Sequence, residues 1–234
     1  MQDLAFRVLR YETVASTQDV LTERARAGED VTGLCARALE QTKGRGRRGT
    51  AWASPLGGSY QSVGLGRGAW PWLTLALGVS VAEALNAAYD AGVTVKWPND
   101  LLLRGGKLGG IIVEVVAGQV VAGVGVNVAD APPGGAALGA RDPEEVSDLV
   151  LSGLAGGVVL AGAGGEAVRE RFAPLDALRG LEVTVATEGE RPSLTGVAVG
   201  VDATGALLLD TGSAGGDPVR VTAGHVARFG RPGR

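Results

Sequence analysis

The segment that most constrains the fold is residues 72–91, which are apolar on most faces of a predicted helix. A helix that is apolar nearly all round belongs in a core. Four β-rich runs follow it, separated by short turns, at residues 93–97, 100–103, 107–116 and 119–128. With 45% apolar and 20% charged residues, the chain has the composition of a globular protein. We therefore expect a buried helix inside a core that also contains strands.

Further elements are predicted on either side of this region. A helix starts at Ser16, an N-cap residue, and stops before Gly28, while residues 143–173 are helical in character but interrupted by glycines at 153, 156 and 157. Two more strands are predicted at residues 5–14 and 34–41, and a third follows at 59–65.

The pattern changes after Leu178. Five short β-rich runs fill the remaining part of the chain, at residues 181–187, 193–201, 205–211, 217–222 and 225–230. Short strands at this spacing are typical of a small barrel or sandwich. We therefore predict two domains, residues 1–178 and 179–234.

Composition excludes several classes of protein. A net charge of -3 argues against a chain whose main role is to coat nucleic acid. The single cysteine, Cys35, excludes an internal disulfide framework, and its expected role is that of a small core residue. Charges near the start of the chain argue against a secretory signal, and we interpret the uncharged residues 149–165 as core helix and loop. A cytoplasmic protein that binds no membrane is expected.

The lysines are the most informative cations. The chain has 19 arginines but only three lysines, Lys43, Lys96 and Lys107. Such a bias indicates that arginine replaces lysine wherever a generic cation suffices. Arginine cannot replace lysine where a compact point charge is needed. The remaining lysines are therefore candidate functional residues.

One lysine lies in a cationic segment, Gln41 to Gly49, that opens a long predicted loop over residues 42–58. Its glycines match the letters of a dinucleotide-binding motif, but no helix is predicted to follow, so that interpretation fails. What remains is a glycine-rich backbone with four cations, which is suited to binding an anion. A solvated basic loop is the alternative, and Trp52 favours a lid over a ligand.

The other two lysines lie within residues 95–114. Residues 100–103 and 107–114 are predicted to pair as a hairpin through Arg104, Gly105 and Gly106, which places Lys107 at a strand start. The glycines in and after this turn would let a ligand approach the backbone closely. A plain hairpin with a surface lysine is the alternative.

Three weaker signals accompany these blocks. Gly123 and Gly125 expose backbone on one face of a predicted strand, and Asn127 shares that face. Close strand packing would explain the glycines equally well. Ser16 and its two neighbours suit either simple helix capping or a polar ligand at a helix N-terminus. His225, the only histidine, lies in the second domain, so catalysis or metal binding by histidine is not expected.

In combination and in this order, the blocks resemble the biotin protein ligases. The resemblance rests on Ser16-Thr17, Gly44 to Trp52, Lys96-Trp97-Pro98-Asn99-Asp100, Lys107-Leu108 with Gly110 and Glu114, and Gly123 to Asn127. It implies an α/β (α+β) fold, in which a mixed-sheet catalytic domain of the biotin/lipoate ligase type is followed by a small SH3-like β-barrel. The start of the chain resembles the short family members, which have no N-terminal DNA-binding domain.

The resemblance also implies a reaction. Biotin and ATP, with Mg²⁺, would give biotinyl-5′-AMP and pyrophosphate, and the biotinyl group would then pass to a lysine of a biotin carboxyl carrier domain of a carboxylase. No residue pattern identifies the Mg²⁺ ligands, and a homodimer is one assembly that the sequence allows.

The family's site residues map onto this chain by motif. Lys107 and Arg47 are implied as catalytic. Biotin would be bound by Ser16, Thr17, Gln18, Gln41, Gly44, Arg45, Gly46, Arg47, Lys107, Gly110, Gly123 and Gly125. ATP would be bound by Arg48, Trp52, Asn99, Asp100, Lys107 and Asn127.

This sequence departs from the family at Gln18, where asparagine is usual, and at Gly109, where alanine is usual; the segment after Asn127 also matches the family poorly. A lipoate or octanoyl ligase or transferase of the same superfamily is the nearest alternative, although those relatives lack the Gly44 to Gly49 block. A nucleic-acid-binding module that uses residues 43–48 is the alternative from another class.

Overall fold

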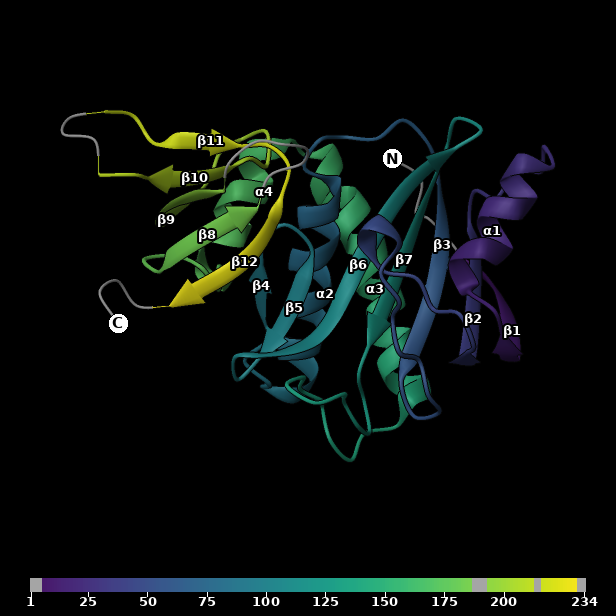
Figure 1. The fold of residues 1–234 in the computed structure, drawn as a ribbon. Coiled ribbons are helices and arrows are strands. Elements are labelled where there is room, and N and C mark those ends of the chain that lie inside the picture. The colour runs from purple at the N-terminus through teal and green to yellow at the C-terminus, as the bar shows by residue number, and fades with distance from the viewer. Residues whose placement is uncertain (1–5, 187–192, 213–215, 231–234) are drawn as a thin grey trace.

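A computed structural model describes residues 6–186, 193–212 and 216–230. The first part of the chain forms one seven-stranded sheet (Figure 1). Its strands are β1 (Arg7–Val14), β2 (Leu34–Gln41), β3 (Ser59–Arg67), β4 (Thr94–Lys96), β5 (Asp100–Leu103), β6 (Gly106–Val116) and β7 (Gln119–Val126). The order across the sheet is β1-β2-β3-β7-β6-β5-β4, and only β1 and β2 are parallel. The predicted mixed sheet is confirmed.

Helices cover both faces of this sheet. Alternate residues of β2 separate the two sides: Leu34 and Ala36 pack with α1 (Thr17–Arg26), whereas Cys35 joins the core around α2 (Leu73–Tyr89) and α3 (Pro143–Gly162). Figure 1 shows α2 and α3 behind the sheet. The predicted buried helix is confirmed as α2, and β5 and β6 form the predicted hairpin, with Arg104 and Gly105 in a turn of positive φ.

The helix α3 corrects the sequence analysis. It runs without interruption through the three glycines that were expected to break it, and the chain leaves it only near Gly164. A Cβ at Gly153 would lie 2.8 Å from the Cα of Val81, and one at Gly157 would lie 2.7 Å from the Cα of Leu77. These two glycines therefore allow α3 to approach the backbone of α2.

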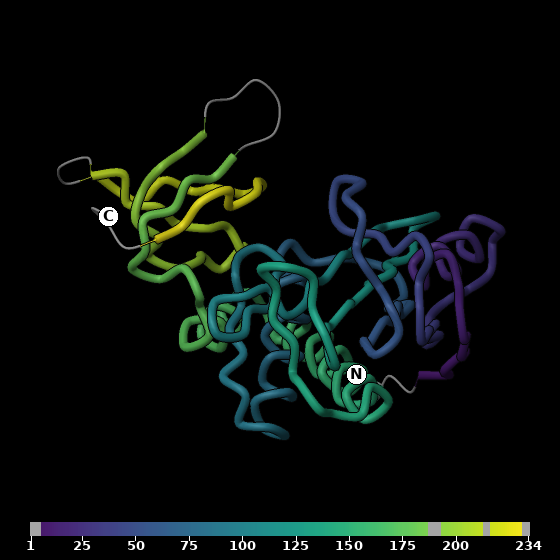
Figure 2. Tube along the Cα trace, turned by 60° about the horizontal axis from the view of Figure 1, so that its bottom comes forward, coloured from purple at the N-terminus to yellow at the C-terminus, as the bar shows by residue number. Residues whose placement is uncertain are grey.

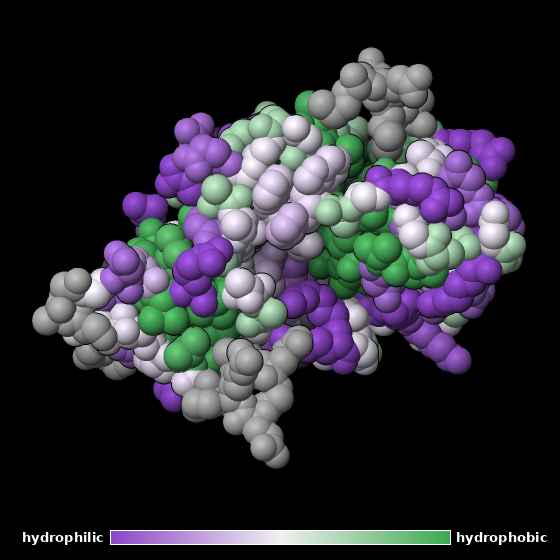
Figure 3. Space-filling model, turned by 90° about the horizontal axis from the view of Figure 1, so that it is seen from above, coloured by the Kyte–Doolittle hydropathy of each residue, from purple (hydrophilic) through white to green (hydrophobic). Residues whose placement is uncertain are grey.

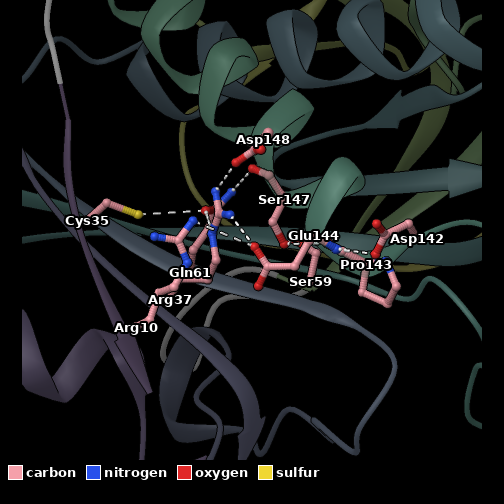
Figure 4. Close-up of polar contacts among 10 residues, drawn as sticks. All are labelled: Arg10, Cys35, Arg37, Ser59, Gln61, Asp142, Pro143, Glu144, Ser147 and Asp148. Atoms are coloured by element: carbon pink, nitrogen blue, oxygen red, sulfur yellow. Dashed lines mark hydrogen bonds and ion pairs between the residues drawn. The ribbon is translucent and has the colours of Figure 1, made fainter. Parts of the chain in front are cut away.

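A buried arginine of β2 joins α3 to the sheet. Arg37 of β2 is only 2% exposed; its guanidinium bonds Glu144 at 2.9 Å and Asp148 at 2.8 Å, both on α3, and its Nε donates to Gln61 of β3 (Figure 4). Two carboxylates thus compensate one buried cation. Cys35 lies beside this cluster, and burial raises the pKa of its thiol to about 11, as expected of a core residue.

The second part of the chain is a five-stranded antiparallel sheet, reached through α4 (Gly165–Phe172). Its strands are β8 (Glu182–Ala186), β9 (Leu194–Val201), β10 (Leu207–Asp210), β11 (Val219–Val221) and β12 (His225–Gly230). All five predicted β-rich runs contain a strand, and the small barrel stands beside the larger sheet (Figure 2). Four parts of the predictions lie outside the described residues: Ala5, Thr187, the first five residues of the first predicted domain and the last four of the second.

The two parts share one core. Buried residues of β8 to β12 belong to the same hydrophobic cluster as α2 and α3, and the indole Nε1 of Trp97 donates to the carbonyl of Gly205 at 2.9 Å. The barrel is therefore held against the end of the sheet where β4 and β5 lie.

By length and hydrophobicity alone, α3 could cross a membrane. In this fold, however, 44% of its most apolar window is buried, and its glycine face lies against α2. On the face drawn in Figure 3, apolar groups are separated by hydrophilic residues.

Replacing Gly157 by alanine tests the packing of α3 on α2. The new methyl group would overpack the contact with Leu77, at a cost of roughly 1–3 kcal/mol. Gly156→Ala is the matched control, because its Cβ would meet Ser80 at an ordinary 3.7 Å. Both variants gain about 1 kcal/mol of helix propensity. We expect urea unfolding to show Gly157→Ala less stable than Gly156→Ala by roughly 1–3 kcal/mol; equal stabilities would contradict the close approach.

Candidate functional site

A cavity of about 610 Å³ lies over the face of the sheet on which α1 packs. Three glycines form part of its floor: Gly123 and Gly125 alternate along β7, and Gly110 of β6 pairs with Gly125. Because none of them carries a side chain, the cavity reaches the backbone of the sheet. The N-terminus of α1, the cationic segment, the β4–β5 turn and β12 form its walls.

Buried polar atoms without partners lie around this floor. Ser16 Oγ, Gln18 Oε1 and Trp52 Nε1 are buried and have no hydrogen-bond partner among the described residues, and all three residues line the cavity. An unpaired buried polar atom is costly. Ser16 is the N-cap residue of α1, but its hydroxyl makes no capping hydrogen bond, so capping alone does not explain it. The site is therefore prepared for a polar ligand.

The cationic segment is a folded hairpin-like loop. The backbone N–H of Trp52 donates to the carbonyl of Gly44 at 2.9 Å, and the backbone N–H of Gly46 donates to the carbonyl of Thr50 at 2.8 Å. A short helical turn, Arg47–Gly49, forms its tip, with Arg48 in the left-handed region at a φ of 55°. The loop therefore presents its arginines from a defined backbone.

Arg45 anchors this loop to the domain. Its guanidinium donates to Asp19 of α1 at 2.8 Å and to Glu114 of β6 at 2.7 Å. Burial alone would lower the pKa of Arg45, but the hydrogen bonds that it donates to Glu114 and Asp19 outweigh this effect and raise that pKa. Arg45 is thus a cation whose charge is already neutralised by protein carboxylates.

Lys107 is held by Asp100 across the β5–β6 hairpin. Lys107 Nζ lies 2.7 Å from one Asp100 carboxylate oxygen, and Lys96 Nζ lies 3.8 Å from the other. Two ammonium groups thus share one carboxylate, so a positive charge remains available to a ligand. Burial lowers the pKa of Lys96; Asp100 opposes this effect, whereas Lys107 adds to it. The alternative of a plain hairpin with a surface lysine does not describe this arrangement.

Asn99 joins the loop to the same turn. Its Oδ1 accepts from Arg47 Nη1 at 3.0 Å, and its Nδ2 donates to the carbonyl of Ile111 at 3.0 Å. The Trp52 indole lies on the backbone of Gly125, where a Cβ would collide with the ring, and Lys107 Nζ is 5.3 Å from the ring centre. Arg47 and Trp52 are therefore brought to the Lys107 side of the cavity.

Almost all predicted site residues line this one cavity. They are Ser16, Thr17, Gln18, Gln41, Arg45, Gly46, Arg47, Arg48, Trp52, Asn99, Asp100, Lys107, Gly110, Gly123 and Gly125. The exceptions are Gly44 and Asn127. Gly44 lies at the base of the loop, where a Cβ would collide with the carbonyl of Trp52 and with Ser54. The amide of Asn127 donates to the carbonyls of Lys107 and Ala136 at 3.2 and 3.1 Å. Asn127 therefore holds the Lys107 backbone, and its donors are not free for ATP.

Two residues that line the cavity, Ser62 and His225, were not among the predicted site residues. Ser62 lines the cavity and shares a 2.9 Å hydrogen bond with Thr17, and its place opposite Gly123 could have been found from strand register alone. His225 also lines it, from β12. Burial lowers the pKa of His225; nearby Lys96 adds to this effect and Asp100 opposes it. No sequence signal linked His225 to this cavity, because the contact depends on how the barrel packs against the larger sheet.

The site offers no protein cage for a metal ion. Within the described ranges, no group of three His, Cys, Asp or Glu side chains is placed to bind a metal ion. The cavity-lining carboxylate of Asp100 already bonds Lys107 and faces Lys96. A magnesium ion here would depend chiefly on phosphate oxygens and water.

Two family profiles match the chain. The biotin/lipoate A/B protein ligase family matches residues 11–129, and the biotin protein ligase C-terminal domain matches residues 180–227. The first range contains every predicted site residue, and the second contains β8 to β11 and the start of β12 with His225.

Individual relatives agree with this assignment. The biotin–[acetyl-CoA-carboxylase] ligase of Mycobacterium tuberculosis is 34% identical over 232 residues, covering 92% of this chain and 86% of that protein. The bifunctional ligase/repressor BirA of Escherichia coli is 39% identical over 126 residues, covering 50% of this chain and 39% of that protein.

Among solved structures, the biotin protein ligase from Aquifex aeolicus in complex with biotin and ATP superposes with a TM-score of 0.82 at 28% identity, covering 96% of this chain and 99% of that one. The shared fold, the matched profiles and the relative that is similar over nearly the whole length lead to one assignment. This chain belongs to the biotin protein ligase family.

Proposed function

We propose that this chain joins biotin to AMP and then transfers the biotinyl group to a lysine of a biotin carboxyl carrier domain. The observation that carries the proposal is the composition of the cavity over the glycine floor. Unpaired buried polar atoms lie around its glycine floor, as a cyclic urea requires, and Lys107 and Arg47 lie together in its wall, as two anions require.

The first step brings like charges together. A carboxylate oxygen of biotin attacks the α-phosphorus of ATP, the bond from that phosphorus to the β-phosphate bridging oxygen breaks, and biotinyl-5′-AMP and pyrophosphate form. Two unit charges 4 Å apart repel by about 4 kcal/mol at an effective dielectric of 20. Lys107 has donors left after its bond to Asp100, and we assign it the place between the carboxylate and the α-phosphate.

Arg47 has the second catalytic role in the proposal. Arg47 lies at the tip of the cationic loop, where its side chain donates a hydrogen bond to Asn99, and it lines the same cavity as Lys107. We assign Arg47 and the Gly46 backbone to covering the acyl-adenylate, which keeps water away from it. Arg48, Trp52 and Asn99 would contact the nucleotide.

The second step consumes the adenylate. The carrier lysine attacks the biotinyl carbonyl carbon as a neutral amine, AMP leaves, and the nitrogen loses a proton to give the amide. ATP is thus spent to make a carboxylate into an acyl donor. Mg²⁺ would enter with the ATP phosphates. The carrier domain as acceptor follows from the family resemblance, and a cytoplasmic location and a homodimer are further parts of this proposal.

Nucleic-acid binding by the cationic loop is less well supported by the geometry. Arg45 is paired with two carboxylates and Arg47 is bonded to Asn99, so two of the four cations are directed inward. The loop consequently presents fewer outward-facing cations to a nucleic-acid backbone than its four cationic residues would suggest.

Isotope exchange tests the proposed activity. The purified chain with Mg²⁺ and ATP should exchange labelled pyrophosphate into ATP when biotin is added, without any carrier protein, because the first step is reversible. Lipoate and octanoate in place of biotin are the controls. Exchange with lipoate but not biotin would support the superfamily alternative, and no exchange with any of these acids would overturn the assignment.

Replacing Lys107 by alanine tests its place between the anions. Removing one preorganised charged donor costs roughly 10²–10³-fold in rate, so we expect biotin-dependent exchange to fall by about that factor. Arg104→Asn is the matched control, because it removes an exposed cation from the turn of the same hairpin, outside the cavity, at a positive φ that asparagine tolerates. Exchange by Lys107→Ala within threefold of this control would remove Lys107 from the reaction.

A further inference from the structure

Glu114 makes two hydrogen bonds that join two elements of the candidate site, helix α1 and the cationic loop. One carboxylate oxygen accepts from Gln18 Nε2 at 2.8 Å, and the other accepts from Arg45 Nη2 at 2.7 Å. Glu114 lies on β6 opposite Val121, and its side chain is 31% exposed. It does not line the main cavity, yet it touches a residue at the α1 end and the anchor of the cationic loop.

The bond to Gln18 determines which way that amide points. An ionised carboxylate only accepts hydrogen bonds, so the amide nitrogen of Gln18 must face Glu114. The same nitrogen donates to the carbonyl of Val121 at 3.3 Å, which uses both of its hydrogens. Gln18 Oε1 is therefore left as a buried acceptor without a partner among the described residues.

That acceptor lies over the glycine floor. Gln18 is 2% exposed, and a Cβ at Gly123 would come within 2.6 Å of its Oε1. A buried acceptor that faces a ligand site demands a donor from the ligand. The N–H groups of a cyclic urea meet that demand, whereas the urea carbonyl would not.

The bond to Arg45 acts on the cationic loop. Arg45 pairs with Ala51 across the base of the cationic loop, and its guanidinium is held by Glu114 and Asp19 together. One carboxylate of this pair is thus shared with Gln18. Removing the charge of Glu114 would loosen the amide orientation and the loop anchor at once.

We propose that Glu114 is a positioning residue for biotin activation: its carboxylate fixes Gln18 with the acceptor toward the ureido N–H and, through Arg45, seats the cationic loop over the cavity. This inference rests on the proposed function, because it takes the ligand to be biotin. Glu114 itself touches no reacting atom.

Glu114→Gln removes the charge but keeps the size of the side chain. The new side-chain amide at position 114 would present an N–H donor, in place of one acceptor oxygen, to Gln18 or to Arg45. The side-chain amide of Gln18 could then rotate. We expect the Kd for biotin by calorimetry, and the KM for biotin in exchange, to rise about 10- to 100-fold. Glu83→Gln is the matched control, because Glu83 also pairs with an arginine, Arg171, but far from the site; its Kd should equal that of the wild type.

Biotin methylated on a ureido nitrogen separates positioning from simple loss of structure. The wild type should lose affinity for the methylated ligand that lacks the N–H facing Gln18. In Glu114→Gln this loss should shrink at least threefold, since Gln18 no longer presents only an acceptor. Glu114→Asp, which keeps a carboxylate, should retain the wild-type discrimination even where its biotin affinity is lower. This second variant also serves if Glu114→Gln does not fold.

The outcomes distinguish this inference from the function on which it rests. If the wild type binds biotin and catalyses exchange while Glu114→Gln does both equally well, or discriminates against the methylated ligand as the wild type does, the role of Glu114 is overturned and the ligase function stands. If the wild type binds no biotin, the proposed function fails and this inference fails with it.

Discussion

The site depends on a part of the sheet that carries no side chains. Gly110, Gly123 and Gly125 lie on one face of β6 and β7, where a larger residue would fill the cavity or displace a neighbour. Trp52 occupies the space over Gly125, and Gln18 the space over Gly123. The glycines therefore determine both the depth of the cavity and the positions of the polar groups around it.

Charge is distributed around this floor in two different ways. At the Arg45 end, one cation is matched by two carboxylates and serves to hold the loop. At the Lys107 end, two ammonium groups share the single carboxylate of Asp100. Cations and carboxylates thus hold the loop in place around Arg45, where carboxylates outnumber the cation. Around Lys107, where cations outnumber the carboxylate, they leave positive charge for anionic substrates.

Local patterns were enough to predict most elements and most of the residues that line the cavity. The hairpin at Arg104, the buried helix α2 and the glycine-rich cationic segment are each encoded within one short stretch of sequence. Strand alternation also places Gly123 and Gly125 on one face without further information.

What was missed depends on contacts between distant segments. Gly153 and Gly157 were predicted to break a helix, because their reason to be glycine is the backbone of α2, which propensity does not reveal. Asn127 was predicted to bind ATP, but it does not line the cavity, and its amide donates to the carbonyls of Lys107 and Ala136. His225 reaches the cavity only because the barrel packs where it does.

A crystal structure of this chain with biotin and a non-hydrolysable ATP analogue tests the central claim most directly. We predict that the ureido N–H faces Gln18 Oε1 over Gly123, and that the biotin carboxylate and the α-phosphate both contact Lys107 Nζ. Biotin bound elsewhere, or Lys107 still turned to Asp100 with no contact to either anion, would contradict the account.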